Sequence, residues 1–278
     1  MSTVSPLRYP GGKGKFYNNI IKIFNDNNIE RPIYCEAFAG GAGLALLLLK
    51  NNIVDKLILN DIDKSIYCFW KSILDFNKEF CEMIKLVNID LAEREIQKKI
   101  QKDKDILNLT KKSDILKLGF STFFLNRVNR SGIIRAGVIG GIEQNGNYKI
   151  DCRFNKKNLI ERIKEINKYK KKIEFYNLDA IDFLKKIEKK KKIFIFFDPP
   201  YFNKGKDLYT NFYSIDDHIN LANHISGLKQ NWIITYDNTD EIRKIYSDFQ
   251  IKEFDILYSL EKKRKEKEIL ICKKNLII

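Results

Sequence analysis

Residues 33–61 decide the fold, and they read IYCEAFAGGAGLALLLLKNNIVDKLILND. Residues 33–38 are an apolar run typical of a short strand, which enters a glycine-rich turn. Residues 44–50 then have the composition of a helix, and residues 56–60 predict a second strand. Strand, glycine turn, helix and strand in this order indicate a parallel sheet with crossover helices, and therefore the α/β class.

The same alternation surrounds this stretch and resumes near residue 170. Residues 16–24 and 63–76 predict helices. Residues 193–197 are apolar on both faces, as expected for a central strand. The later part predicts strands at 173–176, 193–197 and 232–236, helices at 180–187, 214–228 and 239–246, and final strands at 249–257 and 268–272. We therefore expect a Rossmann-like, doubly wound, mostly parallel sheet.

The middle of the chain differs in kind. Residues 77–118 are charged and helical in period, without a convincing strand. Residues 133–150 are glycine-rich and contain Asn145-Gly146-Asn147, a turn signal typical of a β-hairpin. The prediction is a sheet domain of residues 1–76 and 170–278, interrupted by a mainly helical insert of residues 77–169 that contains a β-hairpin.

The charge is strongly positive, with 51 Lys and Arg against 36 Asp and Glu, or +15. This excess favours an anionic partner, with nucleic acid ahead of an acidic membrane. The preference is slight, because richness in Lys, Ile and Asn can also follow from biased base composition in the coding DNA. The longest apolar run, residues 44–49, is too short to span a bilayer, and the N-terminus lacks a signal-peptide layout. The five cysteines form no C-x-x-C pair. We expect a soluble, cytoplasmic protein with reduced thiols.

The glycine turn suggests a ligand. Gly40, Gly41 and Gly43 let the backbone turn sharply and let a ligand approach the following helix closely. Asp61 ends the next strand, about 20 residues further on, where an acidic group reaches ribose hydroxyls. The spacing is not the dinucleotide pattern G-x-G-x-x-G, and a plain tight turn is the alternative. Together the two features favour an adenosine-containing cofactor.

Asp198-Pro199-Pro200-Tyr201 comes directly after the central strand. Open α/β sheets bind ligands at this carboxyl edge. A carboxylate and a backbone carbonyl that accept from a ring amino group would make its nitrogen more nucleophilic. The two prolines would fix that carbonyl, and Tyr201 offers a flat face for a flipped base. The alternative is that Pro-Pro ends the strand and Asp198 caps the next segment.

The N-terminal segment at residues 5–15 reads SPLRYPGGKGK. It looks like a phosphate loop but lacks the required first glycine and the Ser or Thr after lysine, so nucleoside triphosphate chemistry is not expected. The segment could instead cover a cofactor, with Lys13 facing a carboxylate.

These three motifs, in this order, resemble the Dam-like (D12 class) DNA adenine-N6 methyltransferases across nearly the whole chain. Phe124-Leu125-Asn126-Arg127 and Ser131-Gly132-Ile133 also look like that family's segment leading into its DNA-reading hairpin. The resemblance implies base flipping and direct transfer of a methyl group from S-adenosyl-L-methionine to N6 of adenine, in a short sequence of double-stranded DNA. It implies a methyltransferase sheet, a target-recognition insert and no metal.

The resemblance also implies residue roles. Catalysis would involve Asp198, Pro199 and Tyr201. The cofactor would contact Tyr9, Lys13, Glu36, Phe38, Gly40, Asp61, Asp182 and Asp198. DNA would contact Asn126, Arg127, Arg130, Arg135, Lys262 and Arg264. For Arg127, a scaffold ion pair within the insert is the alternative. Many family members have proline at the position of Ala37 and tryptophan at that of Tyr9, and neither difference removes a functional group.

Other functions stay open at this point. Asp-Pro-Pro-Tyr also suits methylation of RNA adenine or of cytosine N4, and a non-catalytic DNA-binding homologue is a further alternative. Carbon-5 methylation of cytosine is not expected because no cysteine follows a proline, and the motifs of zinc deaminases are missing. His218 and His224 are interpreted as ordinary surface or core residues. We expect a prokaryotic or phage-encoded monomer, and an independently acting restriction endonuclease is left open as a companion.

Overall fold

The computed structural model describes residues 4–9, 12–202, 213–258 and 264–278. The chain forms two compact units. The sheet unit comprises Lys13–Ile62 and Tyr176–Ile278, and the helical unit comprises Met1–Gly12 and Asp63–Phe175. These boundaries differ from the predicted ones, because the N-terminal segment and the helix that follows Ile62 belong to the helical unit.

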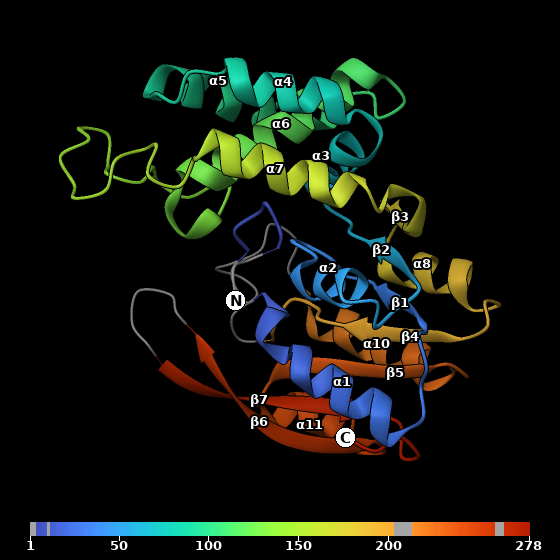
Figure 1. The fold of residues 1–278 in the computed structure, drawn as a ribbon. Coiled ribbons are helices and arrows are strands. Elements are labelled where there is room, and N and C mark those ends of the chain that lie inside the picture. The colour runs from blue at the N-terminus through green and yellow to red at the C-terminus, as the bar shows by residue number, and fades with distance from the viewer. Residues whose placement is uncertain (1–3, 10–11, 203–212, 259–263) are drawn as a thin grey trace. The chain divides into compact units, whose positions relative to one another are not determined.

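A seven-stranded sheet runs in the order β3-β2-β1-β4-β5-β7-β6 (Figure 1). Its strands are β1 (Ile33–Glu36), β2 (Lys56–Asn60), β3 (Ile173–Tyr176), β4 (Ile193–Phe197), β5 (Asn231–Asp237), β6 (Gln250–Tyr258) and β7 (Arg264–Cys272). The division between the two units falls within β3. β1 pairs in parallel with β2 and β4, and β4 with β5, whereas β7 is antiparallel to both of its neighbours. This topology confirms the predicted Rossmann-like, doubly wound, mostly parallel sheet.

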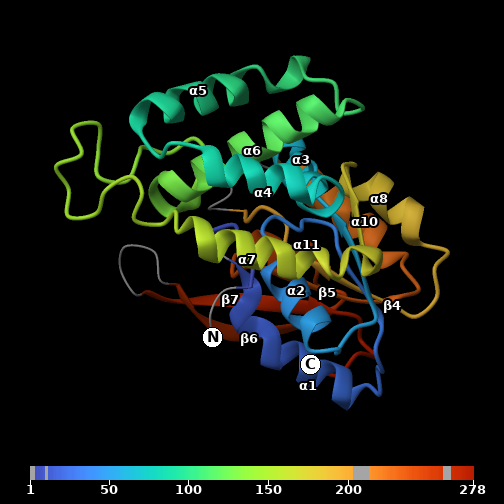
Figure 2. The same ribbon diagram turned by 45° about the horizontal axis from the view of Figure 1, so that its top comes forward.

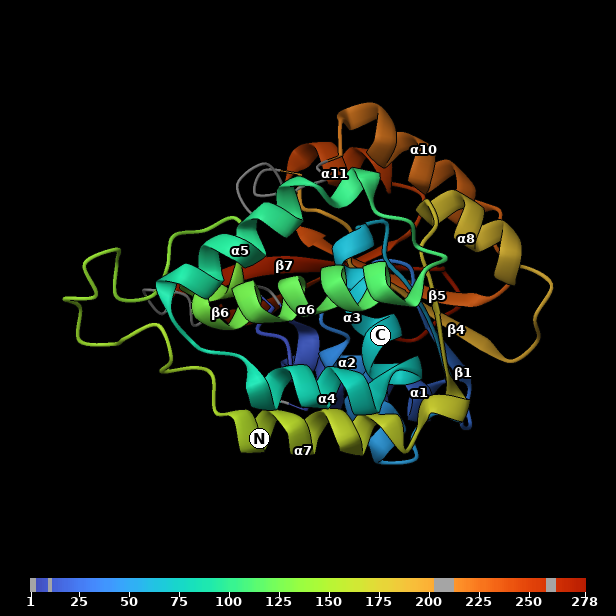
Figure 3. The same ribbon diagram turned by 90° about the horizontal axis from the view of Figure 1, so that it is seen from above.

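Helices cover both faces of the sheet. Figure 3 shows α1 and α2 on one face and α8, α10 and α11 on the other. The helical elements of this unit are η1 (Lys13–Phe16), α1 (Tyr17–Asp26), α2 (Gly43–Lys50), α8 (Ala180–Ile187), α10 (Ile215–Ser226) and α11 (Asp240–Ile245). All five residues of β4 are buried, as its uniformly apolar sequence predicts. The strand order reverses on either side of β1 and β4, which makes the carboxyl edge there the expected ligand site.

The helical unit has an aromatic core. It contains α3 (Lys64–Asp75), α4 (Asn77–Leu86), α5 (Leu91–Lys102), η2 (Lys104–Ile106), α6 (Lys112–Val128), η3 (Arg130–Gly132), α7 (Lys156–Asn167) and η4 (Lys170–Lys172). α6 packs against α3 and α5, and α7 packs against α4 (Figure 2). Phe69 of α3 stacks on Phe123 of α6 at 6.1 Å. Gly119 permits this close packing, since a Cβ there would lie 2.5 Å from the Cys68 carbonyl oxygen.

The β-hairpin predicted for residues 133–150 is wrong. This segment is a series of turns with one isolated antiparallel bridge, and it projects from the helices as the yellow-green stretch between α6 and α7 in Figure 1. The Gln144 side chain explains the difference, because it donates to the Ile139 carbonyl at 2.9 Å and accepts from the Ile150 N–H at 2.8 Å. A side chain that occupies backbone groups competes with strand pairing.

Among the described residues, no helix is both long and apolar enough to cross a membrane.

Candidate active site

Asp198 is the first residue beyond β4, at the carboxyl edge of the sheet. Its Oδ1 lies 2.9 Å from Lys13 Nζ and accepts a hydrogen bond from Thr235 Oγ1 at 2.8 Å. The hydrogen bond from Thr235 and the 2.9 Å contact with Lys13 both involve Oδ1. Two neighbours on one oxygen therefore fix the orientation of the carboxylate and leave its second oxygen for a ligand.

Lys13 joins three segments of the sheet unit. Its side chain is 5% exposed, and its ammonium also donates to Tyr201 Oη at 2.7 Å and lies 3.7 Å from Glu268 Oε2 on β7. A buried lysine needs such partners because burial of an unpaired charge is costly. The expected pairing of Lys13 with a carboxylate is confirmed, while its contact with a cofactor stays a prediction.

The Asp-Pro-Pro-Tyr segment rests on a buried aromatic cluster. Pro199 is buried and Tyr201 half-buried, with the Tyr201 ring 6.5 Å from that of Tyr236. His218 is fully buried, and its Nδ1 lies 2.9 Å from Tyr236 Oη. Burial lowers the pKa of His218, against the opposing effect of the Asp237 carboxylate, and favours the neutral ring. His218 is thus a core residue, one of the two predicted alternatives.

The glycine turn after β1 is held by Asp61. Gly40 has a φ of +45°, in the left-handed region that glycine tolerates best. Its N–H donates to Asp61 Oδ2 at 2.9 Å, so the carboxylate at the end of β2 braces the turn. A Cβ placed at Gly43 would meet no heavy atom within 4 Å. The glycine turn and Asp61 are therefore joined by a hydrogen bond, and their joint part in a cofactor site stays a prediction.

Asn60 is a positioning residue that the sequence analysis missed. Its side chain is buried, and Nδ2 donates to the carbonyls of Ala37 and Leu178, each at 3.0 Å. Its Oδ1 accepts from the Leu178 N–H at 3.0 Å. Asn60 thus ties together the segments that follow β1 and β3, on either side of its own strand. The sequence feature that could have revealed this role is the asparagine side chain at the end of a largely apolar strand.

Glu36 ends β1 and is 5% exposed. The pKa of Glu36 is raised to about 8, chiefly by burial and also by the neighbouring Asp198 carboxylate, against a lowering by the Tyr34 hydroxyl and the Ala45 backbone. The Tyr34 oxygen has no hydrogen-bond partner among the described residues, so its influence on Glu36 is electrostatic. Glu36 can therefore be neutral near pH 7.

Two further predicted cofactor residues lie in the sheet unit. Phe38 is half-buried and packs edge-to-face with Tyr213 at 5.8 Å. Asp182 lies in the first turn of α8, where its carboxylate is 62% exposed and pairs with Lys185 at 2.9 Å. Asp179, the N-cap of that helix, is nearer in sequence to the end of β3. A contact between Asp182 and adenine stays a prediction.

The predicted contribution of Asn126 needs correction. Its side chain is 3% exposed, accepts from the Arg8 N–H, and donates to the Arg8 and Gly132 carbonyls, all at 2.7 Å. Both amide hydrogens are therefore used within the helical unit, because they hold the N-terminal segment. We remove Asn126 from the candidate DNA contacts.

Arg127 also binds backbone rather than a carboxylate. Its Nε donates to the Arg153 carbonyl at 2.7 Å and its Nη1 to the Pro6 carbonyl at 3.4 Å. The alternative of a scaffold ion pair is therefore wrong: Arg127 is held within the helical unit, but by backbone carbonyls, which are neutral acceptors. Arg130 and Arg135 are exposed on the helical unit.

The other predicted contacts are less fully described. Tyr9 is half-buried in the helical unit, so its part in the cofactor site stays a prediction. Lys262 lies outside the described residues, and Arg264 is the first residue of β7.

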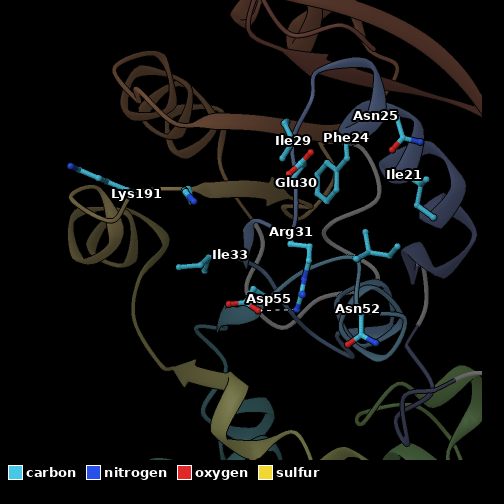
Figure 4. Close-up of a pocket in the computed structure, with 12 residues that line it drawn as sticks. Ile21, Phe24, Asn25, Ile29, Glu30, Arg31, Ile33, Asn52, Asp55 and Lys191 are labelled. Atoms are coloured by element: carbon cyan, nitrogen blue, oxygen red, sulfur yellow. Dashed lines mark hydrogen bonds and ion pairs between the residues drawn. The ribbon is translucent and has the colours of Figure 1, made fainter.

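A pocket of about 760 Å³ lies at the opposite edge of the sheet (Figure 4). Its lining includes Ile33 at the start of β1, Asp55 just before β2 and Lys192 just before β4. Figure 4 shows the ion pair of Arg31 and Asp55 beside it. Because parallel α/β sheets place their chemistry at the carboxyl edge, this amino-edge pocket is not the candidate active site.

Comparisons with known proteins agree with the motif order. A family model described as D12 class N6 adenine-specific DNA methyltransferase matches residues 9–260. A search of curated proteins found no match.

Solved structures with a similar course of the chain include a candidate RNA methyltransferase from Pyrococcus horikoshii and a conserved hypothetical protein from Streptococcus pyogenes. Each is 10% identical and is matched over 96% of this chain, with TM-scores of 0.45 and 0.39. The matches cover 86% and 98% of those chains, respectively. At these scores the likeness decides nothing about substrate.

Proposed function

The chain belongs to the D12 class N6 adenine-specific DNA methyltransferase family, and we propose that it methylates N6 of adenine in a short sequence of double-stranded DNA. Family membership makes it an S-adenosylmethionine-dependent methyltransferase. The observation that carries the finer proposal is Asp198, whose Oδ1 is held by Lys13 and Thr235, so that Oδ2 is the oxygen we assign to the base.

The donor set at the carboxyl edge suits a cationic cofactor. The described carboxylates there include those of Glu36, Asp61, Asp198 and Glu268, and the cation paired with two of them is Lys13. Even with Glu36 neutral, this group carries net negative charge, which favours a sulfonium ion. When bound, S-adenosylmethionine supplies an electrophilic methyl group. We propose that the turn at Gly40, together with Glu36, Phe38, Asp61 and Lys13, holds it.

The Asp-Pro-Pro-Tyr segment would bind the target base. Asp198 Oδ2 would accept one hydrogen of the adenine amino group, and the Pro199 carbonyl would accept the other. These two acceptors draw the nitrogen lone pair out of conjugation with the ring. Tyr201, whose hydroxyl is held by Lys13, would stack on the flipped base and offset part of the few kcal/mol that extrusion costs.

Methyl transfer with a matched control tests this proposal. The full-length protein is incubated with tritiated S-adenosylmethionine and either duplex DNA or RNA, and methylation-aware sequencing then locates any modified base. Asp198→Ala should lose N6-methyladenine formation, because the amino group loses its acceptor. Asp55→Ala should keep it, because Asp55 is 62% exposed at the opposite edge of the sheet.

Two outcomes would overturn the proposal. Preferential labelling of RNA, or of cytosine N4, would assign one of the other amino-methylation activities. Equal labelling by wild type and Asp198→Ala would remove Asp198 from the chemistry.

A further inference from the structure

Three arginines gather in the helical unit at the base of the projecting segment between α6 and α7. Arg127 lies in the last turn of α6, Arg153 shortly precedes α7, and Arg8 comes from the N-terminal segment. The Arg127 guanidinium touches the Arg153 backbone, donating to its carbonyl through both Nε and Nη2. Segments distant in sequence thus meet here, and the charges of their three guanidinium groups act on one another.

The partners of these guanidinium groups are neutral. Arg127 donates to the Arg153 and Pro6 carbonyls, and Arg8 Nη1 donates to the Asn129 carbonyl at 3.0 Å. Within the described parts of the chain, no carboxylate lies in ion-pair range of Arg8, Arg127 or Arg153. Elsewhere Arg31, Arg94 and Arg243 each pair with an acidic side chain. The cluster therefore carries positive charge that no described protein group neutralises.

The like charges act on one another. The pKa of Arg127 is lowered to about 10, chiefly by burial and also by the charges of Arg8, Arg162 and Arg153. Burial is also the main cause that lowers the pKa of Arg8, and the charge of Arg153 is the second cause. Like charges that lie near one another without an acidic partner create a region of high positive potential. A bound anion would reduce the repulsion between them.

The protein holds this arrangement in place by itself. Asn126 binds both the N–H and the carbonyl of Arg8, each at 2.7 Å, which fixes the backbone of that arginine. Arg153 is exposed, and its guanidinium carbon lies 5.7 Å from the centre of the Tyr148 ring, in cation–π range. Each arginine carries five N–H donors, and Arg8 uses one of them in the guanidinium bond to Asn129. Donors therefore remain for an oxyanion.

We propose that Arg8, Arg127 and Arg153 form a site for backbone phosphate of duplex DNA. The proposal rests on the proposed function for its choice of DNA, and it assigns Arg127 a phosphate contact in place of base reading. Guanidinium groups suit phosphate because their planar N–H pairs match two of its oxygens. Contacts of this kind set the position of the protein on the duplex without reading sequence.

The salt dependence of DNA binding tests the site directly. Fluorescence anisotropy on full-length protein and a short labelled duplex gives the association constant over a range of salt concentrations. Each lost phosphate contact should make the slope of log K against log salt shallower by about 0.9. Arg8→Gln and Arg153→Gln should each show this change and weaker binding. Arg31→Gln, which removes a 58% exposed arginine paired with Asp55, is the matched control and should keep the wild-type slope.

The outcomes separate this inference from the proposed function. Arg127→Gln also removes bonds that brace Pro6 and Arg153, so the test relies on Arg8→Gln and Arg153→Gln instead. Wild-type slope and affinity in both Arg8→Gln and Arg153→Gln would overturn the site, even if wild type methylates DNA. Shallower slopes in both variants support the site even if no methylation is detected. Tighter binding of duplex RNA, with the same slope changes, would keep the phosphate site and overturn the choice of DNA.

Discussion

Replacing Asn60 with leucine should weaken cofactor binding and stability together. The substitution keeps a similar volume but removes three side-chain hydrogen bonds, two donated to the carbonyls of Ala37 and Leu178 and one accepted from the Leu178 N–H. A buried polar group left without a partner costs about 1–3 kcal/mol. Asn60→Leu leaves three backbone groups without their partner, and some of them can find another partner by a small rearrangement. We therefore expect the free energy of unfolding to fall by about 3 kcal/mol.

The loss should reach the cofactor site because Ala37 begins the segment that continues into the glycine turn. Urea unfolding measures the stability, and isothermal titration calorimetry measures the dissociation constant for S-adenosylmethionine. We expect an increase of at least about tenfold in that constant, equivalent to about 1.4 kcal/mol. The matched control is Asn51→Leu, which removes an exposed hydrogen bond to Tyr17 and should change stability by about 0.5 kcal/mol or less.

Three results can be told apart. Lower stability with weaker cofactor binding supports a positioning role, which a KM effect larger than the kcat effect would strengthen. Lower stability with unchanged cofactor affinity would refute the link between Asn60 and the site. Unchanged stability would refute the hydrogen-bond argument itself.

Other predictions concern charge and packing. Lys13→Met should lower stability by about 3–5 kcal/mol and abolish methyl transfer, because it leaves the buried Glu268 and the partly buried Asp198 without their cation; urea unfolding and a methylation assay measure the two effects. For Glu36, the folded pKa of about 8 exceeds the ordinary value of 4.5, so its stabilising contribution is complete below pH 4.5 and declines as pH rises to 8. Glu36→Gln should remove this decline, which has a limiting slope of about 1.4 kcal/mol per pH unit, and unchanged pH dependence of the unfolding midpoint would contradict the assignment. Gly119→Ala should cost about 1–3 kcal/mol by forcing α6 away from the Cys68 carbonyl, whereas Gly43→Ala, with open space around it, should not destabilise; thermal unfolding compares them.

The regular elements were largely predictable from local pattern. The bounds of β2, β3, β4 and α8 agree with the prediction because each is a compact run flanked by turn or polar residues. The hairpin was wrong because the Asn145-Gly146 signal is local, while Gln144 occupies backbone groups on both sides of that turn. Side-chain competition of this kind depends on the final fold of the segment and not on its composition.

The sequence by itself determined the class of fold, the edge of the sheet where chemistry belongs and the motifs that lie there. Only the tertiary structure decided which motif residues meet: Lys13 and Tyr201 are 188 positions apart, yet 2.7 Å separates their polar atoms. It also decided that Asn126 is a buried brace and that three arginines share one region. The physical reason is that strand and helix periodicity is encoded within a few residues, whereas burial and charge pairing depend on segments that meet only after folding.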